Sequence, residues 1–158
     1  MSKAKYSKFE LASNQLETAI GLFVSGGDRF SVITLAGAAD VIFSQLVLNK
    51  GEPNFTDHLL ANDADVSSKA MRRQQYGREV NDTLFINDLK HMDSIKDHSV
   101  TFDAETCAIA AILKAVANIV DLGGREFDFV QAFLAWVRLN LDPKNFNINC
   151  DPEWEPST

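Results

Sequence analysis

The sequence predicts an all-α protein, an antiparallel up-and-down bundle of five long helices plus one short helix. Apolar side chains recur every three to four residues in five long segments, the spacing that places them on one face of a helix. No segment shows the strict apolar–polar alternation of a half-buried strand. The 158 residues include only 8 glycines and 4 prolines, too few turn residues for a sandwich of short strands.

The first two helices are bounded by clear local signals. Apolar residues predict a helix over about residues 7–25, and Gly26 and Gly27 end it because glycine accepts the left-handed conformation that closes helices. Ser31 is the expected N-cap of a second helix over residues 32–49. This second helix is apolar on most sides, so we expect it at the centre of the bundle.

A single charge, Asp40, interrupts the apolar stretch from Phe30 to Asn49. A buried carboxylate needs a partner or a proton, and the candidate partners are His91 and Arg73. Alternatively, Asp40 reaches solvent at the edge of the helix. Serine, threonine and glutamine dilute the stretch, so we expect a buried helix of a cytoplasmic protein rather than a membrane span.

The remaining helices are expected at residues 54–60, 67–93, 104–122 and 126–140. Asp103 is the expected N-cap of the helix that follows it, and Pro143 prevents the last helix from continuing. The length fits one domain, which we place at residues 1–145. Residues 146–158 contain two prolines and several acids and are expected to form a mobile acidic C-terminal tail.

Charge and cysteine content exclude several classes of protein. With 15 basic and 22 acidic residues the net charge is −7, which disfavours non-specific binding to nucleic acid. The two cysteines, Cys107 and Cys150, are too few for a disulfide framework or a four-cysteine zinc site. Cys107 lies in an apolar helix and is expected to serve packing. No nucleotide-binding glycine motif occurs, so no cofactor is expected. The group His91, Asp93, Asp97 and His98 has no standard metal-ligand spacing, so no metal is expected.

One basic segment departs from the acidic average. It comprises Lys69, Arg72, Arg73, Tyr76 and Arg78. A stripe of cations with an aromatic ring suits phosphate binding or base stacking, although most such clusters are solvated helix faces.

The pair Asn87 and His91 is the main candidate for chemistry. The two residues are four apart, so on a continuous helix their side chains meet on one face. His91 would project from the apolar face, and an imidazole there suits general acid/base work. Lys90 would point towards solvent, about 100° away. The alternative is a buried histidine satisfied by a neighbouring amide.

Several stretches resemble a known family. Residues 12–23, 26–28 and 34–39 are similar to an uncharacterised group of bacterial helical proteins, in which Leu-x-x-Ala-Ile-x-Leu-Phe leads through Gly-Asp into Thr-Leu-Ala-x-Ala-Ala. Residues 87–93 are similar to its later Asn-x-x-Lys-His-x-Asp. More distantly the chain resembles the HEPN (higher eukaryotes and prokaryotes nucleotide-binding) superfamily of helical bundles. Ile86 stands where the catalytic signature of that superfamily has an arginine.

The resemblance implies a HEPN-like homodimer that pairs through apolar helix faces. Two functions are open. The first is a regulatory protein that binds a protein partner or small ligand, with Asp40, Arg73, Tyr76 and Asp93 as candidate ligand-binding residues.

The second is a metal-independent ribonuclease of a toxin–antitoxin or phage-defence system. There His91 would be the general acid/base, Asn87 would hold the phosphate or orient His91, and Lys90 would stabilise charge. RNA has weaker support as a partner than a protein or small ligand, and no membrane association is expected.

Overall fold

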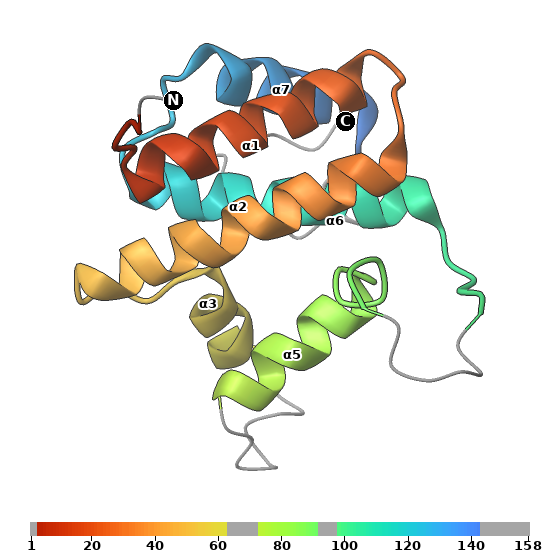
Figure 1. Ribbon diagram of the computed structural model, residues 1–158, viewed down its shortest axis with the longest axis horizontal. Helices are drawn as coiled ribbons and strands as arrows, with labels where there is room; N and C mark the ends of the chain where they lie inside the picture. The colour runs from red at the N-terminus through yellow and green to blue at the C-terminus, as the bar shows by residue number, and fades with distance from the viewer. Residues whose placement is uncertain (1–2, 63–72, 92–97, 143–158) are drawn as a thin grey trace.

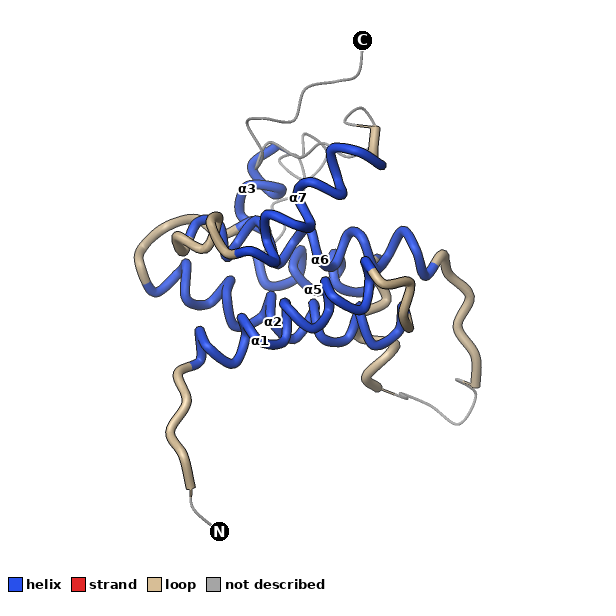
Figure 2. The backbone as a smooth tube through the Cα atoms, turned by 90° about the horizontal axis from the view of Figure 1, so that it is seen from above, coloured by secondary structure: helices blue, strands red, loops and turns tan. Residues whose placement is uncertain are grey.

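The computed structural model describes residues 3–62, 73–91 and 98–142, and every regular element in these ranges is a helix. The helices are α1 (Lys8–Val24), α2 (Arg29–Asn49), α3 (Phe55–Asn62), α5 (Arg73–Thr83), α6 (Ala104–Asp121) and α7 (Asp128–Asn140). The described residues outside these helices form loops and turns (Figure 2). The all-α class is therefore confirmed for the described part of the chain. The expected tail at residues 146–158 lies outside it.

The helices are arranged around α2 and α6. α2 packs closely against both α1 and α6, and α7 packs against α1. Figure 1 shows α1 and α7 on one side of α2 and α6, with α3 and α5 on the other side. The largest fully buried side chains of the core include Leu16, Ile33, Phe43, Ile112, Ile119 and Phe133. The apolar core thus lies among α1, α2, α6 and α7. The shorter helices α3 and α5 lie on the opposite side of α2 and α6.

Two aspartates cap the helices that carry the site. The Asp28 carboxylate accepts from the Ser31 N–H at 2.8 Å, so α2 begins at Arg29 and the expected cap at Ser31 is wrong. Ser31 instead supplies a first-turn N–H, one of the donors that a helix start leaves unpaired. Asp103 caps α6 as predicted, accepting from the Thr106 N–H at 3.1 Å.

The long helix expected over residues 67–93 is wrong in its second half. α5 ends at Thr83, and residues 84–90 form hydrogen-bonded turns. Residues 63–72 and 92–97 lie outside the described part of the chain.

A Schellman motif ends α5. The Ile86 N–H donates to the Asn81 carbonyl at 3.0 Å, and the Phe85 N–H donates to the Asp82 carbonyl at 3.0 Å. Phe85 takes the left-handed conformation, with φ 56°, where glycine is the usual residue. Ile86 is buried and its side chain lies against Gly37 of α2. The contacts of Ile86 offset the cost of the left-handed conformation of Phe85. That conformation turns the chain away from the axis of α5.

Among the helices of the described residues, α2 alone is long and apolar enough to cross a membrane. Just under half of the apolar stretch is buried inside the fold, between α1 and α6. The core helix of a protein that never enters a membrane meets the same criteria of length and composition, so this is weak evidence for a span.

Candidate functional site

The site begins with Asp40, in the middle of α2, whose side chain is only 2% exposed. Its Oδ2 accepts from the ammonium of Lys114, and its Oδ1 accepts from Asn118 Nδ2 at 2.7 Å. Both partners come from α6. The sequence suggests His91 or Arg73 for this role, but in the described residues Asp40 is bound by Lys114 and Asn118 instead. The carboxylate is therefore paired and hydrogen-bonded, as a buried charge must be.

Lys114 is the buried cation of the site. It is 4% exposed and lies within an otherwise apolar stretch of α6. Besides Asp40, its ammonium donates to Asn81 Oδ1 of α5 at 3.2 Å. An ammonium carries three N–H donors, so one remains without a partner among the described residues. Lys114 thus connects α2, α5 and α6.

Asn118 connects the same network to α3. It is fully buried, and its Oδ1 accepts from the Phe55 N–H at 2.9 Å. Next to it, the Asp57 N–H donates to Asn54 Oδ1 at 3.0 Å and the Asn54 N–H donates to Asp57 Oδ2 at 2.9 Å. These reciprocal bonds form a capping box, so α3 begins beside Asn118 because its own sequence specifies a helix start there.

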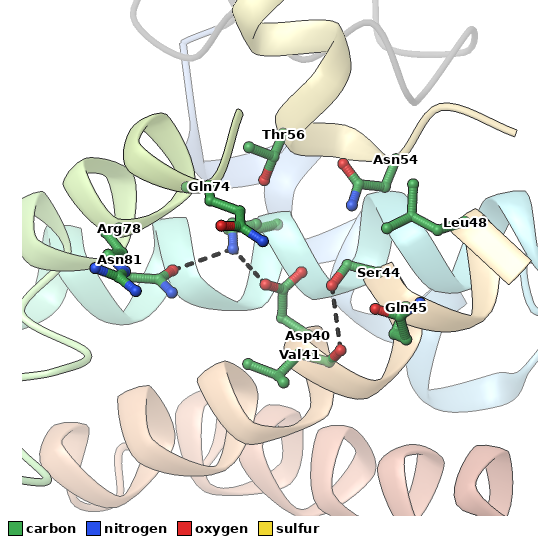
Figure 3. Close-up of a pocket in the computed structure, with 12 residues that line it drawn as sticks. Asp40, Val41, Ser44, Gln45, Leu48, Asn54, Thr56, Gln74, Arg78 and Asn81 are labelled. Atoms are coloured by element: carbon green, nitrogen blue, oxygen red, sulfur yellow. Dashed lines mark hydrogen bonds and ion pairs between the residues drawn. The ribbon is translucent and has the colours of Figure 1, made fainter. Parts of the chain in front are cut away.

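A pocket of about 380 Å³ lies between α2, α3, α5 and α6, with Asp40 and Lys114 in its lining. Figure 3 shows Arg78 and Asn81 on the α5 side, Thr56 and Asn54 on the α3 side, and Asp40 between them. Most of the remaining lining is polar. The polar and charged residues described there are Asp40, Ser44, Gln45, Asn54, Thr56, Gln74, Arg78, Asn81 and Lys114.

Lys90 lies within electrostatic range of this buried pair. Partial burial lowers the pKa of Lys90 below its ordinary value, attraction to Asp40 raises it, and repulsion from Lys114 lowers it further. Predicted as a catalytic residue, Lys90 is thus a neighbour of the pocket's charges although the pocket lining does not include it.

The other two predicted catalytic residues lie apart from the pocket. His91 is exposed and follows the turns after α5, and its backbone N–H donates to the Asn87 carbonyl at 3.0 Å. The Asn87 side chain donates from Nδ2 to Asp82 Oδ1 at 2.6 Å. The expected projection of His91 from the apolar face depended on one continuous helix, which the Schellman motif interrupts before Asn87. Their catalytic role remains a prediction.

Among the described residues of the basic segment, one lines the pocket. Arg78 lines it, whereas Tyr76 is half-buried elsewhere on α5. Arg73 is the first residue of α5, and nothing of its side chain is described. Lys69, Arg72 and Asp93 lie outside the described residues.

Sequence reasoning missed Lys114 and Asn118. A signal was present, because the two polar residues are four apart in an apolar helix and therefore share one face. A polar pair on a buried helix face requires a polar partner elsewhere in the fold. Asp40, the lone charge of the other central helix, meets that requirement.

Cys107 is buried, and burial followed by the charge of Asp103 raises the pKa of its thiol. A protonated, enclosed thiol is a poor nucleophile, which agrees with a packing role.

In the described ranges no group of three or more His, Cys, Asp or Glu residues could hold a metal ion. Comparison with protein-family models, with curated proteins and with solved structures gives no match for this chain.

Proposed function

We propose that the protein binds a small polar molecule in the pocket between α2, α3, α5 and α6. The observation that carries the proposal is the position of the buried Asp40–Lys114 pair, which forms part of the pocket wall. Burying two charges costs several kcal/mol per ion, and apolar residues of similar size often pack at least as well. A charged pair beside a cavity is therefore better explained by recognition of a ligand than by stability.

The rest of the pocket supports the same function. Its volume of about 380 Å³ is at the small end of the range for small-molecule sites. The amides of Gln45, Gln74 and Asn81 both donate and accept, and the hydroxyls of Ser44 and Thr56 do the same. Such groups fix the orientation of a polar ligand, whereas the packed α2 and α6 hold the charged pair in place.

This ligand-binding role belongs to a wider proposal, in which the chain is a regulatory, HEPN-like helical protein of bacterial type. In that proposal it acts in the cytoplasm as a homodimer. This part rests on the resemblance of residues 12–23, 26–28, 34–39 and 87–93 and on the breadth of the apolar helix faces. Ribonuclease activity would replace ligand binding as the function if His91 proved essential for degrading RNA.

The test is to fill the pocket. Gly77 lines it, and among the described residues a Cβ atom there would meet only Thr56, at 3.8 Å. A Gly77→Leu variant therefore places a side chain in the cavity at little cost to the helix. Gly21→Leu is the matched control, because Gly21 is an exposed helical glycine with nothing within 4 Å of its Cβ position.

The probes are polar fragments in four groups: carboxylates, phosphates, neutral amides and amines. Saturation-transfer NMR measures binding to the wild type and to both variants. We expect binding to the wild type and to Gly21→Leu, and loss of binding in Gly77→Leu. Binding that persists in Gly77→Leu, or no binding by any fragment, would overturn the proposal. Degradation of RNA by the wild type but not by His91→Ala would favour the ribonuclease alternative.

A further inference from the structure

We propose that the molecule bound in this pocket carries an anionic group, a carboxylate or a phosphate, held between Arg78 and the free N–H of Lys114. This inference rests on the proposed ligand-binding function and adds the chemical class of the ligand. It follows from the charges of the lining, from the donors that have no partner among the described residues and from the geometry of arginine.

The described lining carries an excess of positive charge. Asp40 is its one acid, and Lys114 and Arg78 are its two bases. Because Asp40 and Lys114 neutralise one another, the charge of Arg78 is left over. Lys90 adds a further cation within range of the same pair. The pocket is thus locally positive although the net charge of the chain is −7. A positively charged pocket raises the local concentration of anions.

Arg78 is the strongest candidate for direct contact. Its guanidinium makes no hydrogen bond or ion pair with the other described residues, although it lies on α5 at the side of the pocket (Figure 3). Arginine presents paired N–H groups in a plane that matches the two oxygens of a carboxylate or phosphate. Its outer side is exposed, so an incoming anion reaches it without displacing an internal partner.

Lys114 supplies the second contact. Two of its three donors are taken by Asp40 and Asn81, and the third has no partner in the described part of the chain. The oxygens of Asp40 are already bound by Lys114 and Asn118. A cationic ligand would therefore find each oxygen of its best acceptor already bound to a donor, and two bases beside it. An anion instead meets a donor of Lys114 and the guanidinium of Arg78, neither of which has a partner within residues 3–62, 73–91 and 98–142.

The experiment compares probes that differ in charge. Inorganic phosphate, acetate, neutral acetamide and methylammonium are titrated separately into ¹⁵N-labelled protein, and shifts of pocket amides give the dissociation constants. The test variant is Arg78→Gln. Its matched control is Lys8→Gln, which removes one positive charge from the exposed start of α1, away from the lining.

We expect phosphate or acetate to bind more tightly than acetamide and methylammonium. Arg78→Gln is expected to weaken anion binding at least tenfold, and Lys8→Gln less than twofold. Preference for phosphate or for acetate identifies which oxyanion the pocket takes, and either result supports the inference.

Two results overturn it. In the first, acetamide or methylammonium binds best and Gly77→Leu abolishes that binding, so the pocket is a ligand site for another class of molecule. In the second, anions bind but Arg78→Gln has no more effect than Lys8→Gln. If no probe of any charge shifts the pocket amides, both this inference and the proposed function fail.

Discussion

Asn118 of α6 donates from Nδ2 to Asp40 Oδ1 of α2 at 2.7 Å, and both side chains are buried. The opposite atom of the same amide, Oδ1, accepts from the Phe55 N–H. A carboxylate can only accept and a backbone N–H can only donate, so the two contacts require one orientation of the amide. Asn118 therefore sets the distance between α2 and the start of α3, two elements that frame the pocket.

Asn118→Ala is expected to lower the free energy of unfolding by about 2–4 kcal/mol, because it leaves an acceptor on Asp40 and the Phe55 N–H without partners. Urea unfolding followed by circular dichroism measures the change. Asn140→Ala is the control: that amide bonds to the Trp136 carbonyl at an exposed site, and we expect less than about 0.5 kcal/mol. Equal effects of the two substitutions would contradict the bridging role of Asn118.

Lys114→Met is expected to destabilise the fold by about 3–5 kcal/mol, because it leaves the Asp40 charge buried without its counter-ion. Adding Asp40→Asn removes that charge while keeping an oxygen for Asn118. The double variant should therefore be more stable than Lys114→Met alone, which a double-mutant cycle of chemical unfolding measures. A double variant as unstable as the sum of the two single changes would show that the side chains do not act as a pair.

The effect of Gly37→Ala on the free energy of unfolding should depend on the residue at position 86. The substitution should destabilise the wild type and stabilise an Ile86→Ala variant. A Cβ at Gly37 would lie 2.7 Å from the Cγ2 atom of Ile86, so in the wild type we expect a loss of about 1–3 kcal/mol from overpacking. In an Ile86→Ala background the clash is absent, and alanine should stabilise the helix by up to about 1 kcal/mol. Thermal unfolding of the four proteins tests this. A loss of the same size in both backgrounds would argue against the contact.

The capping carboxylates predict how stability changes in acid. The Ser31 hydroxyl and N–H lower the pKa of Asp28 below its ordinary 3.8, and the Thr106 N–H followed by its hydroxyl lowers that of Asp103. Because both pKa values are lower in the folded chain, their contribution is complete above about 3.8 and is lost as the pH falls through the lowered values.

Asp28→Asn and Asp103→Asn keep an oxygen that accepts at the cap but remove the titration. We therefore expect melting temperatures that fall less steeply below pH 3.8 than that of the wild type. Asp121→Asn should have the opposite effect, and above pH 3.8: burial raises the pKa of Asp121, so its protonation stabilises the fold as the pH falls from that raised value to 3.8, and the variant loses this contribution. If the melting temperatures of the wild type and of the cap variants fall equally with decreasing pH, the two caps do not cause the loss of stability in acid.

Local signals predicted most helices well. The periodicity of apolar residues places α1, α6 and α7 within about two residues of their observed ends, and Asp103 was recognisable as a cap. The start of α2 was missed because Asp28 and Ser31 are both good capping residues and only the backbone decides between them.

The end of α5 was missed for a different reason. A left-handed C′ residue is usually glycine, and here it is Phe85, whose ring stacks on Phe102 with centroids 4.6 Å apart. That stacking and the burial of Ile86 stabilise the turn through residues distant in sequence. Periodicity alone extends the helix through this point, and the expected position of His91 on the apolar face of that helix followed from the extension.

For the site, composition identified one half of the central pair. Asp40 is conspicuous as a lone charge in an apolar helix, but its partner lies 74 residues further along the chain. Which of the 15 basic residues pairs with Asp40 depends on tertiary packing, and one sequence alone does not reveal it. The same holds for Arg78, whose role follows from the position of α5 over the pocket rather than from its neighbours in sequence.

The location of Asp40 also bears on how the chain folds during synthesis. α2 leaves the ribosome well before α6, and without Lys114 and Asn118 it is an apolar helix with one carboxylate at its centre. At the middle of a lipid bilayer that carboxylate would oppose insertion by about 3 kcal/mol. Within the finished fold the same group is matched by a cation and an amide. Asp40 is thus one of the side chains of α2 that oppose insertion into a bilayer, and Asp40→Leu would remove that contribution.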